Sequence, residues 1–156
     1  PYIVALMTEL LRPAPAHQVL EIGTGSGYQA AVLSLLVKHV YTIEIVPELA
    51  QRSTELLRKL GYANVTVRCG DGYQGWPEHA PFDRIILTAA PPDVPPALTA
   101  QLKPGGVLVA PVGGSLFDQN LVVVEKAQDG RLRRRTVTPV RFVPMVRGKT
   151  EDGRRR

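Results

Sequence analysis

The chain has 156 residues, of which 44% are hydrophobic and 21% charged, the balance of one folded domain, which excludes disorder over the whole length. No apolar run reaches the ~18 residues of a membrane span, and Glu9 interrupts the apolar start, so we expect no membrane segment and no signal peptide. The net charge of +5 arises in residues 131–156, which contain ten basic and two acidic residues. We interpret this strip as a solvated strand edge and a flexible basic tail at 149–156, because no aromatic residues alternate with its arginines to stack on bases.

The first two thirds of the chain alternate between strand and helix patterns. Residues 18–22 form a short apolar run that ends at a glycine cluster, which predicts a buried strand entering a turn. A helix begins at Pro47 and stops at Gly61, with Leu49, Leu56, Leu57 and Leu60 on its apolar face. The other patterns predict helices at 1–11, 28–37 and 96–102, strands at 39–45, 65–69, 82–88 and 107–112, and a turn at 103–106.

The last third of the chain changes to a hairpin pattern. Residues 120–126 and 133–143 are strand-like, and Asp129-Gly130 between them is a hairpin signal. Strands separated by helices favour right-handed crossovers and a parallel sheet that is covered on both faces. We therefore predict an α/β fold: a Rossmann-like, doubly wound, mostly parallel sheet with a C-terminal antiparallel hairpin, in a single domain over residues 1–148.

A glycine-rich turn follows the first strand. It reads Glu21-Ile22-Gly23-Thr24-Gly25-Ser26-Gly27, and glycines let the backbone turn sharply and approach a ligand. A dinucleotide fingerprint would need a third glycine at position 28, where this chain has Tyr28, which disfavours a nicotinamide dehydrogenase. In such sheets ligands bind at the carboxyl ends of the strands. The turn is thus a candidate ligand site.

Acidic residues follow or end the next two strands. Glu44 ends the second strand, where a carboxylate can accept hydrogen bonds from ribose hydroxyls. Asp71 follows the third strand between Gly70 and Gly72, where an acceptor could meet an adenine amino group. Together with Glu21, these acids point to a nucleoside ligand.

This pattern resembles the S-adenosylmethionine-dependent methyltransferases and, more narrowly, the protein-L-isoaspartate O-methyltransferase family. The resemblance covers almost the whole chain. It is carried by residues 1–7, 20–28, 70–72, 75–77, 80–83, 88–90, 102–106, 111–113 and 140–145.

The resemblance implies S-adenosyl-L-methionine as cofactor and isoaspartyl-containing proteins and peptides as substrates, which receive a methyl group on the free α-carboxylate in a protein-repair reaction. It implies that Glu21, Gly23, Thr24, Gly25, Ser26 and Gly27 hold the methionine portion of the cofactor. It also implies that Glu44 binds the ribose, that Gly70 and Asp71 bind the adenine, and that Val143, Pro144 and Met145 border the substrate. In the family the active-site serine lies upstream of the residue that matches Pro1, so no catalytic residue is assigned here, and activity of this chain is left open.

The chemistry of the acceptor agrees with this interpretation. An α-carboxylate has a pKa of roughly 3.5 and is already ionised at neutral pH, so methyl transfer to it needs orientation more than a general base. No Ser-His-Asp or Cys-His constellation surrounds the turn, and His17, His39 and His79 lack metal-ligand spacing, so we expect no metal.

Other functions remain open at this point. One is an S-adenosylmethionine-binding module with little or no turnover, and another is a methyltransferase acting on RNA or a small molecule. The segment Ala90-Pro91-Pro92-Asp93 lacks the amide or acid before the prolines that amino-group methylases carry. We expect a cytoplasmic monomer without a nucleic-acid partner, and the single cysteine, Cys69, fits a reducing compartment and is predicted to be buried.

Overall fold

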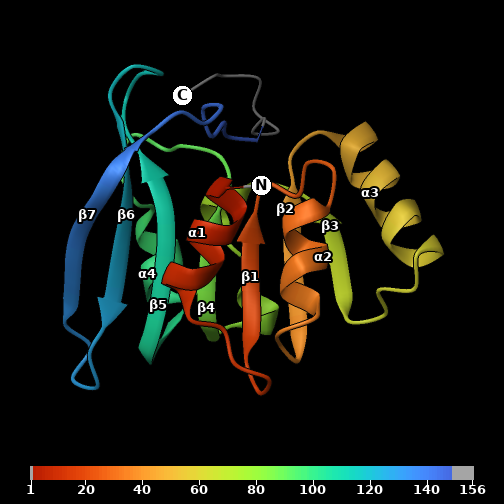
Figure 1. Cartoon of the computed structure of the whole chain (residues 1–156), viewed down its shortest axis with the longest axis horizontal. Helices are drawn as coiled ribbons and strands as arrows, with labels where there is room; N and C mark the ends of the chain where they lie inside the picture. The colour runs from red at the N-terminus through yellow and green to blue at the C-terminus, as the bar shows by residue number, and fades with distance from the viewer. Residues whose placement is uncertain (1, 149–156) are drawn as a thin grey trace.

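Seven strands form one sheet in the computed structural model, which describes residues 2–148 (Figure 1). The sheet order is β3-β2-β1-β4-β5-β6-β7. The first five strands pair in parallel, and β6 and β7 pair antiparallel at one edge. The strands are β1 (Gln18–Ile22), β2 (His39–Glu44), β3 (Val65–Cys69), β4 (Phe82–Leu87), β5 (Leu102–Val112), β6 (Gln119–Lys126) and β7 (Leu132–Val140). The predicted fold class is therefore confirmed, including the C-terminal hairpin.

The strand order reverses between β1 and β4. From β1 the chain moves outward to β2 and β3, and it then returns to place β4 on the other side of β1. Such a switch point leaves a crevice at the carboxyl ends of the two strands, because their following loops diverge. The glycine turn after β1 lies at this crevice.

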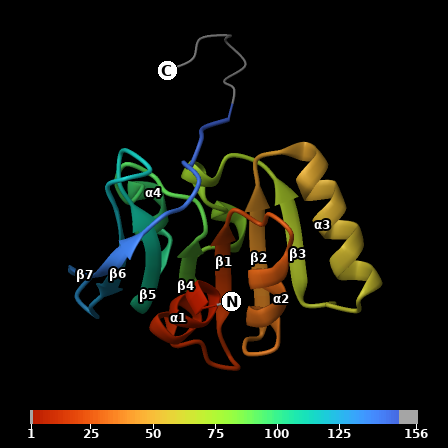
Figure 2. The same cartoon turned by 45° about the horizontal axis from the view of Figure 1, so that its top comes forward.

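Helices cover both faces of the sheet (Figures 1 and 2). On one face, α1 (Tyr2–Leu11) and α2 (Tyr28–Ser34) pack their buried residues against the strands, and α3 (Pro47–Lys59) packs on β2 and β3. The other face carries α4 (Pro96–Ala100) and two short 3₁₀ helices, η1 (Gly72–Gln74) and η2 (Pro77–His79). Pro47 at the start of α3 and basic residues in its last turn match the preferences of helix ends.

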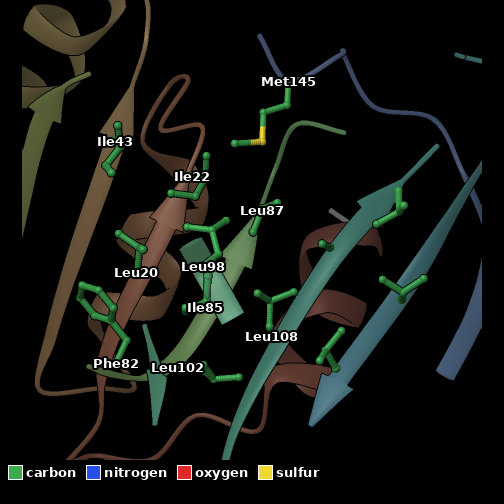
Figure 3. Packing of buried hydrophobic residues seen from close by; sticks show 14 of the residues in the cluster. Leu20, Ile22, Ile43, Phe82, Ile85, Leu87, Leu98, Leu102, Leu108 and Met145 are labelled. Carbon is green, nitrogen blue, oxygen red and sulfur yellow. The ribbon is translucent and has the colours of Figure 1, made fainter. Parts of the chain in front are cut away.

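The core on the α4 face reaches up to the carboxyl ends of the strands. Leu20, Phe82, Ile85 and Leu98 are fully buried in it (Figure 3). Met145, far away in sequence, lies at the top of this cluster beside Ile22 (Figure 3). A late segment of the chain is thus packed onto the crevice between β1 and β4.

Several element boundaries differ from the predictions: α4 ends at Ala100 instead of at residue 102, and β7 ends at Val140 instead of at residue 143. The helix predicted over 28–37 ends at Ser34, where the side-chain amide of Asn64 donates a hydrogen bond of 2.8 Å to the Ser34 carbonyl. The turn predicted at 103–106 lies inside β5 instead. The pairing of β4 with β5 shifts its register there, and this irregularity accommodates the positive φ of Gly105 within a strand.

The leucine face predicted for α3 is wrong in part. Leu57 is buried, but Leu49, Leu56 and Leu60 are exposed. The helix contacts the edge of the sheet through a narrow stripe of Ala50, Ser53 and Leu57, and the other leucines lie outside this stripe. Cys69 was expected to be buried and is exposed, because it ends the edge strand β3.

Within the described residues, no helix is long and apolar enough to cross a membrane. Part of the basic strip is visible on β7 and the turn before it. Arg131 pairs with Asp129, and Arg134 pairs with Asp93 at 2.6 Å. The tail predicted at 149–156 lies outside the described residues.

Candidate cofactor and acceptor site

The turn after β1 requires glycine at two positions for different reasons. Gly23 has a φ of +97°, and a Cβ built on it would lie 2.6 Å from the Thr88 Oγ1 atom, so the adjoining strand leaves no room for a side chain. Gly25 has a φ of +52°, and a Cβ there would meet nothing within 4 Å. Gly25 lines the cavity at the crevice, so its open side is where a ligand can approach the backbone.

Glu44 connects the end of β2 to this turn. Its Oε1 atom accepts a hydrogen bond of 2.8 Å from the backbone N–H of Gly25, and its Oε2 atom accepts one of 3.0 Å from Val46. The residue is buried and also lines the cavity. Each carboxylate oxygen can accept a further hydrogen bond, so Glu44 is available to hydroxyl groups of a ligand.

Glu21 lies elsewhere than its predicted role suggests. It is completely buried and does not line the cavity. Its Oε1 atom accepts a hydrogen bond of 2.6 Å from Thr42, whose hydroxyl lies 2.6 Å from that of Thr24 in the turn. Its Oε2 atom has no hydrogen-bond partner among the residues that the structure describes. Burial, opposed by the Thr42 hydrogen bond and reinforced by the charge of Glu44, raises the pKa of Glu21 to about 8. Glu21 supports the turn indirectly, because it accepts a hydrogen bond from Thr42, which in turn contacts Thr24.

The other predicted turn residues divide between two surfaces. Gly23 and Gly25 line the cavity, whereas Ser26 and Gly27 line a separate apolar groove between α2 and α3. Thr24 is buried and faces Thr42.

The segment after β3 reaches the cavity through one glycine. Gly70 donates a backbone hydrogen bond of 3.0 Å to the Glu44 carbonyl. Asp71 caps η1, because its side chain accepts a hydrogen bond of 2.9 Å from the backbone N–H of Tyr73. Gly72 lines the cavity, while Gly70 and Asp71 lie beside it. Among the described residues, the bond from Tyr73 is the one hydrogen bond that the Asp71 side chain accepts.

The opposite wall is formed by the C-terminal segment of residues 141–147, which we call the strap. The backbone N–H of Ala90 donates a hydrogen bond of 2.8 Å to the Val143 carbonyl, and the N–H of Met145 donates one of 2.8 Å to the Ala90 carbonyl. These bonds form a parallel bridge at Pro144. Val143, Pro144 and Met145, the predicted substrate residues, line the same cavity as Gly25 and Glu44.

The cavity has a volume of about 320 Å³ and falls at the lower end of the range for small-molecule sites. Within residues 2–148, Glu44 is the one charged residue that lines it, and most of the other lining residues are apolar. Sequence reasoning missed several lining residues: Ile22 and Ile43 near the strand ends, Ile45, Val46, Thr88 and Ala89 after β2 and β4, Leu49 in α3, Gly72 in η1, and Val146 in the strap. Several of them end or directly follow predicted strands, which was the available signal. In the part of the chain that the structure describes, no three His, Cys, Asp or Glu residues gather as metal ligands.

The comparisons with known proteins agree with this geometry. The family model of "Protein-L-isoaspartate(D-aspartate) O-methyltransferase (PCMT)" matches residues 1–150. The chain is 57% identical to a protein-L-isoaspartate O-methyltransferase 2 of Syntrophobacter fumaroxidans over 148 residues, covering 95% of this chain and 60% of that protein. It is also 57% identical to a relative of the same name from Polaromonas sp., and the match covers 94% of this chain and 69% of that protein.

Solved structures show the same relationship. A protein-L-isoaspartate O-methyltransferase matches with a TM-score of 0.86 and 33% identity, over 92% of this chain and 46% of that one. A structure of a putative protein-L-isoaspartate O-methyltransferase from Plasmodium falciparum in complex with S-adenosyl-L-homocysteine has the same fold. It matches with a TM-score of 0.76 and 23% identity, over 94% of this chain and 74% of that one. The chain spans 60% of the first relative's length. By sequence and by fold, this chain belongs to the protein-L-isoaspartate(D-aspartate) O-methyltransferase family.

Proposed function

We propose that this chain binds S-adenosyl-L-methionine and transfers its methyl group to the free α-carboxylate of L-isoaspartyl residues in damaged proteins. The observation that carries the proposal is the hydrogen bond between Glu44 and Gly25 inside a cavity at the strand switch point. A carboxylate that holds an open glycine turn is suited to a nucleoside with ribose hydroxyls.

The residues around the cavity fit this cofactor. Gly25 leaves the turn open, so the methionine portion can lie against the backbone. Glu44 binds the ribose hydroxyls, and Asp71 with Gly70 faces the adenine edge. Thr24, Ser26 and Gly27 shape the turn, and Glu21 supports it through Thr42. Ile45 and Val46 supply apolar contacts for the flat face of the base.

The acceptor side of the cavity is apolar. Val143, Pro144 and Met145 border the incoming isoaspartyl residue and exclude water from it. When bound, the cofactor supplies an electrophilic methyl carbon on a sulfonium. An oxygen of the acceptor carboxylate bonds to that carbon as the carbon–sulfur bond breaks, so no proton has to be removed. The chain's own residues therefore bind and orient the two reactants.

A methyl-transfer assay with matched isoaspartyl and aspartyl peptides tests the proposal. We expect transfer to the isoaspartyl peptide alone, and calorimetry should show S-adenosyl-L-homocysteine binding. Binding without transfer to either peptide would instead identify a cofactor-binding module, and transfer to RNA would identify a nucleic-acid methyltransferase.

The remaining features belong to the same proposal. We infer a single domain over residues 1–148 that works as a monomer in the cytoplasm, without a nucleic-acid partner. Two ion pairs, Arg131 with Asp129 and Arg134 with Asp93, support the absence of a nucleic-acid partner, because they occupy two arginines of the basic strip. Gel filtration and RNA binding at varied salt concentration test these points.

A further inference from the structure

The strap leaves the sheet before it reaches the cavity. The β6–β7 ladder ends at the pair Gln119–Val140, and the next backbone bridge is at Pro144. Between these points the strap has no strand partner. Without another contact, nothing would fix the distance between this part of the strap and the sheet.

Gln119 supplies that contact through its side chain. Its Oε1 atom accepts a hydrogen bond of 2.7 Å from the backbone N–H of Phe142, and its Nε2 group donates one of 2.9 Å to the Phe142 carbonyl. The side-chain amide thus reproduces the two hydrogen bonds of a strand pair, two residues beyond the end of the ladder. Gln119 is only 3% exposed, so both bonds are shielded from water.

Beyond Phe142 the strap is anchored twice more. Met145 is buried at the top of the core (Figure 3), and its carbonyl accepts a hydrogen bond of 3.0 Å from the Tyr73 hydroxyl. The Arg147 guanidinium lies over the Tyr73 ring, 4.0 Å from its centroid. Between the anchors, Val143 and Val146 are 68% and 55% exposed and line the cavity.

We propose that Gln119 is a positioning residue for the acceptor peptide. By binding Phe142, it fixes the position of the strap relative to the sheet. This in turn fixes where Val143 and Val146 lie at the cavity. Gln119 itself does not line the cavity. This inference rests on the proposed function, because it treats the strap as the acceptor wall.

The chain offers a matched control in Gln101. Its side chain also binds the backbone twice. It accepts a hydrogen bond of 2.9 Å from the Trp76 N–H and donates one of 3.0 Å to the Gln74 carbonyl. Gln101 lies at the end of α4 and does not line the cavity. Q119L and Q101L therefore remove the same type of double hydrogen bond, and only Q119L removes one that is made to the strap itself.

The first measurement is amide hydrogen exchange in the chain with S-adenosyl-L-homocysteine bound. In Q119L we expect exchange over residues 141–147 to accelerate by about tenfold, the effect of losing a hydrogen-bonded contact. In Q101L it should stay at the wild-type rate. Unchanged exchange of the strap in Q119L would overturn the proposal.

The second measurement separates positioning from general destabilisation. With isoaspartyl peptide as substrate, Q119L should raise KM by about tenfold and leave kcat within about twofold, because the acceptor wall is displaced but the reacting groups are retained. An equal rise of KM in Q101L would contradict the proposal. If the wild-type chain transfers no methyl group, the proposed function fails, and isoaspartyl-peptide affinity measured by fluorescence anisotropy replaces KM. An affinity that Q119L leaves unchanged would then overturn the inference.

Discussion

The backbone N–H of Gly25 donates a hydrogen bond to the Oε1 atom of Glu44, and the two atoms are 2.8 Å apart. This contact joins the turn after β1 to the last residue of β2, so one carboxylate both shapes the glycine turn and lines the cavity. Removing it should therefore affect the turn and the ligand together.

Substitution of Glu44 should weaken cofactor binding. We expect E44A to cost about 1 to 3 kcal/mol of S-adenosyl-L-homocysteine affinity, because a charge-assisted acceptor is lost from a mostly buried site. E44Q should lose less, since one acceptor oxygen remains. Titration calorimetry measures both, with E48A on the exposed start of α3 as control. Wild-type affinity in E44A would show that Glu44 is only a strand-end acid.

A methyl group on Gly25 should fill space that the ligand needs. Both Gly25 and Gly61 have positive φ, and a Cβ on either would meet nothing within 4 Å, but only Gly25 lines the cavity. G25A and G61A should each lose about 1 kcal/mol of unfolding free energy, the cost of the left-handed conformation. Only G25A should also lose cofactor affinity, by at least about tenfold. Denaturant titration and calorimetry compare the two, and equal affinities would refute a close approach of the ligand to Gly25.

Glu21 should make stability fall as the pH rises. The folded chain keeps a proton on this carboxyl up to a pKa of about 8, whereas the unfolded chain releases it near 4.5. Unfolding between these values releases a proton, so the unfolding free energy should decrease with pH by up to about 1.4 kcal/mol per pH unit.

The variant E21Q should lack this contribution, because an amide does not ionise there. Burial also lowers the pKa values of His17 and His39, but these contributions are common to wild type and variant and cancel in their difference. Urea unfolding from pH 5 to 8 measures the difference, with E9Q, at an exposed site, as control. A difference that does not change with pH would mean that Glu21 is ionised in the folded chain.

Two adjacent leucines of α3 should differ sharply in their contribution to stability. Leu57 is 4% exposed and lies against Gly27 of the glycine turn, whereas Leu56 is 47% exposed. L57A should cost about 2 to 4 kcal/mol through lost burial and a cavity, and L56A should cost less than about 1 kcal/mol. Thermal or urea unfolding tests this. Equal costs would restore the full leucine face that the sequence pattern predicts.

The sequence alone determined the order and type of the elements. The predicted bounds of β1 and β3 match the structure, because short apolar runs closed by glycines leave little ambiguity. The glycine turn and Glu44 were also predictable as site residues, since the carboxyl ends of parallel strands meet at one edge of the sheet.

Tertiary structure alone decided which of these residues reach the cavity. Glu21 and Glu44 look equivalent in sequence, yet Glu21 is fully buried and bonded to Thr42, while Glu44 lines the cavity. The path of the strap likewise depends on Gln119 and Ala90, which lie 23 and more than 50 positions before their partners. Local periodicity reports which face of an element is buried. Contacts between distant segments depend on how the elements pack, and local patterns do not contain that information.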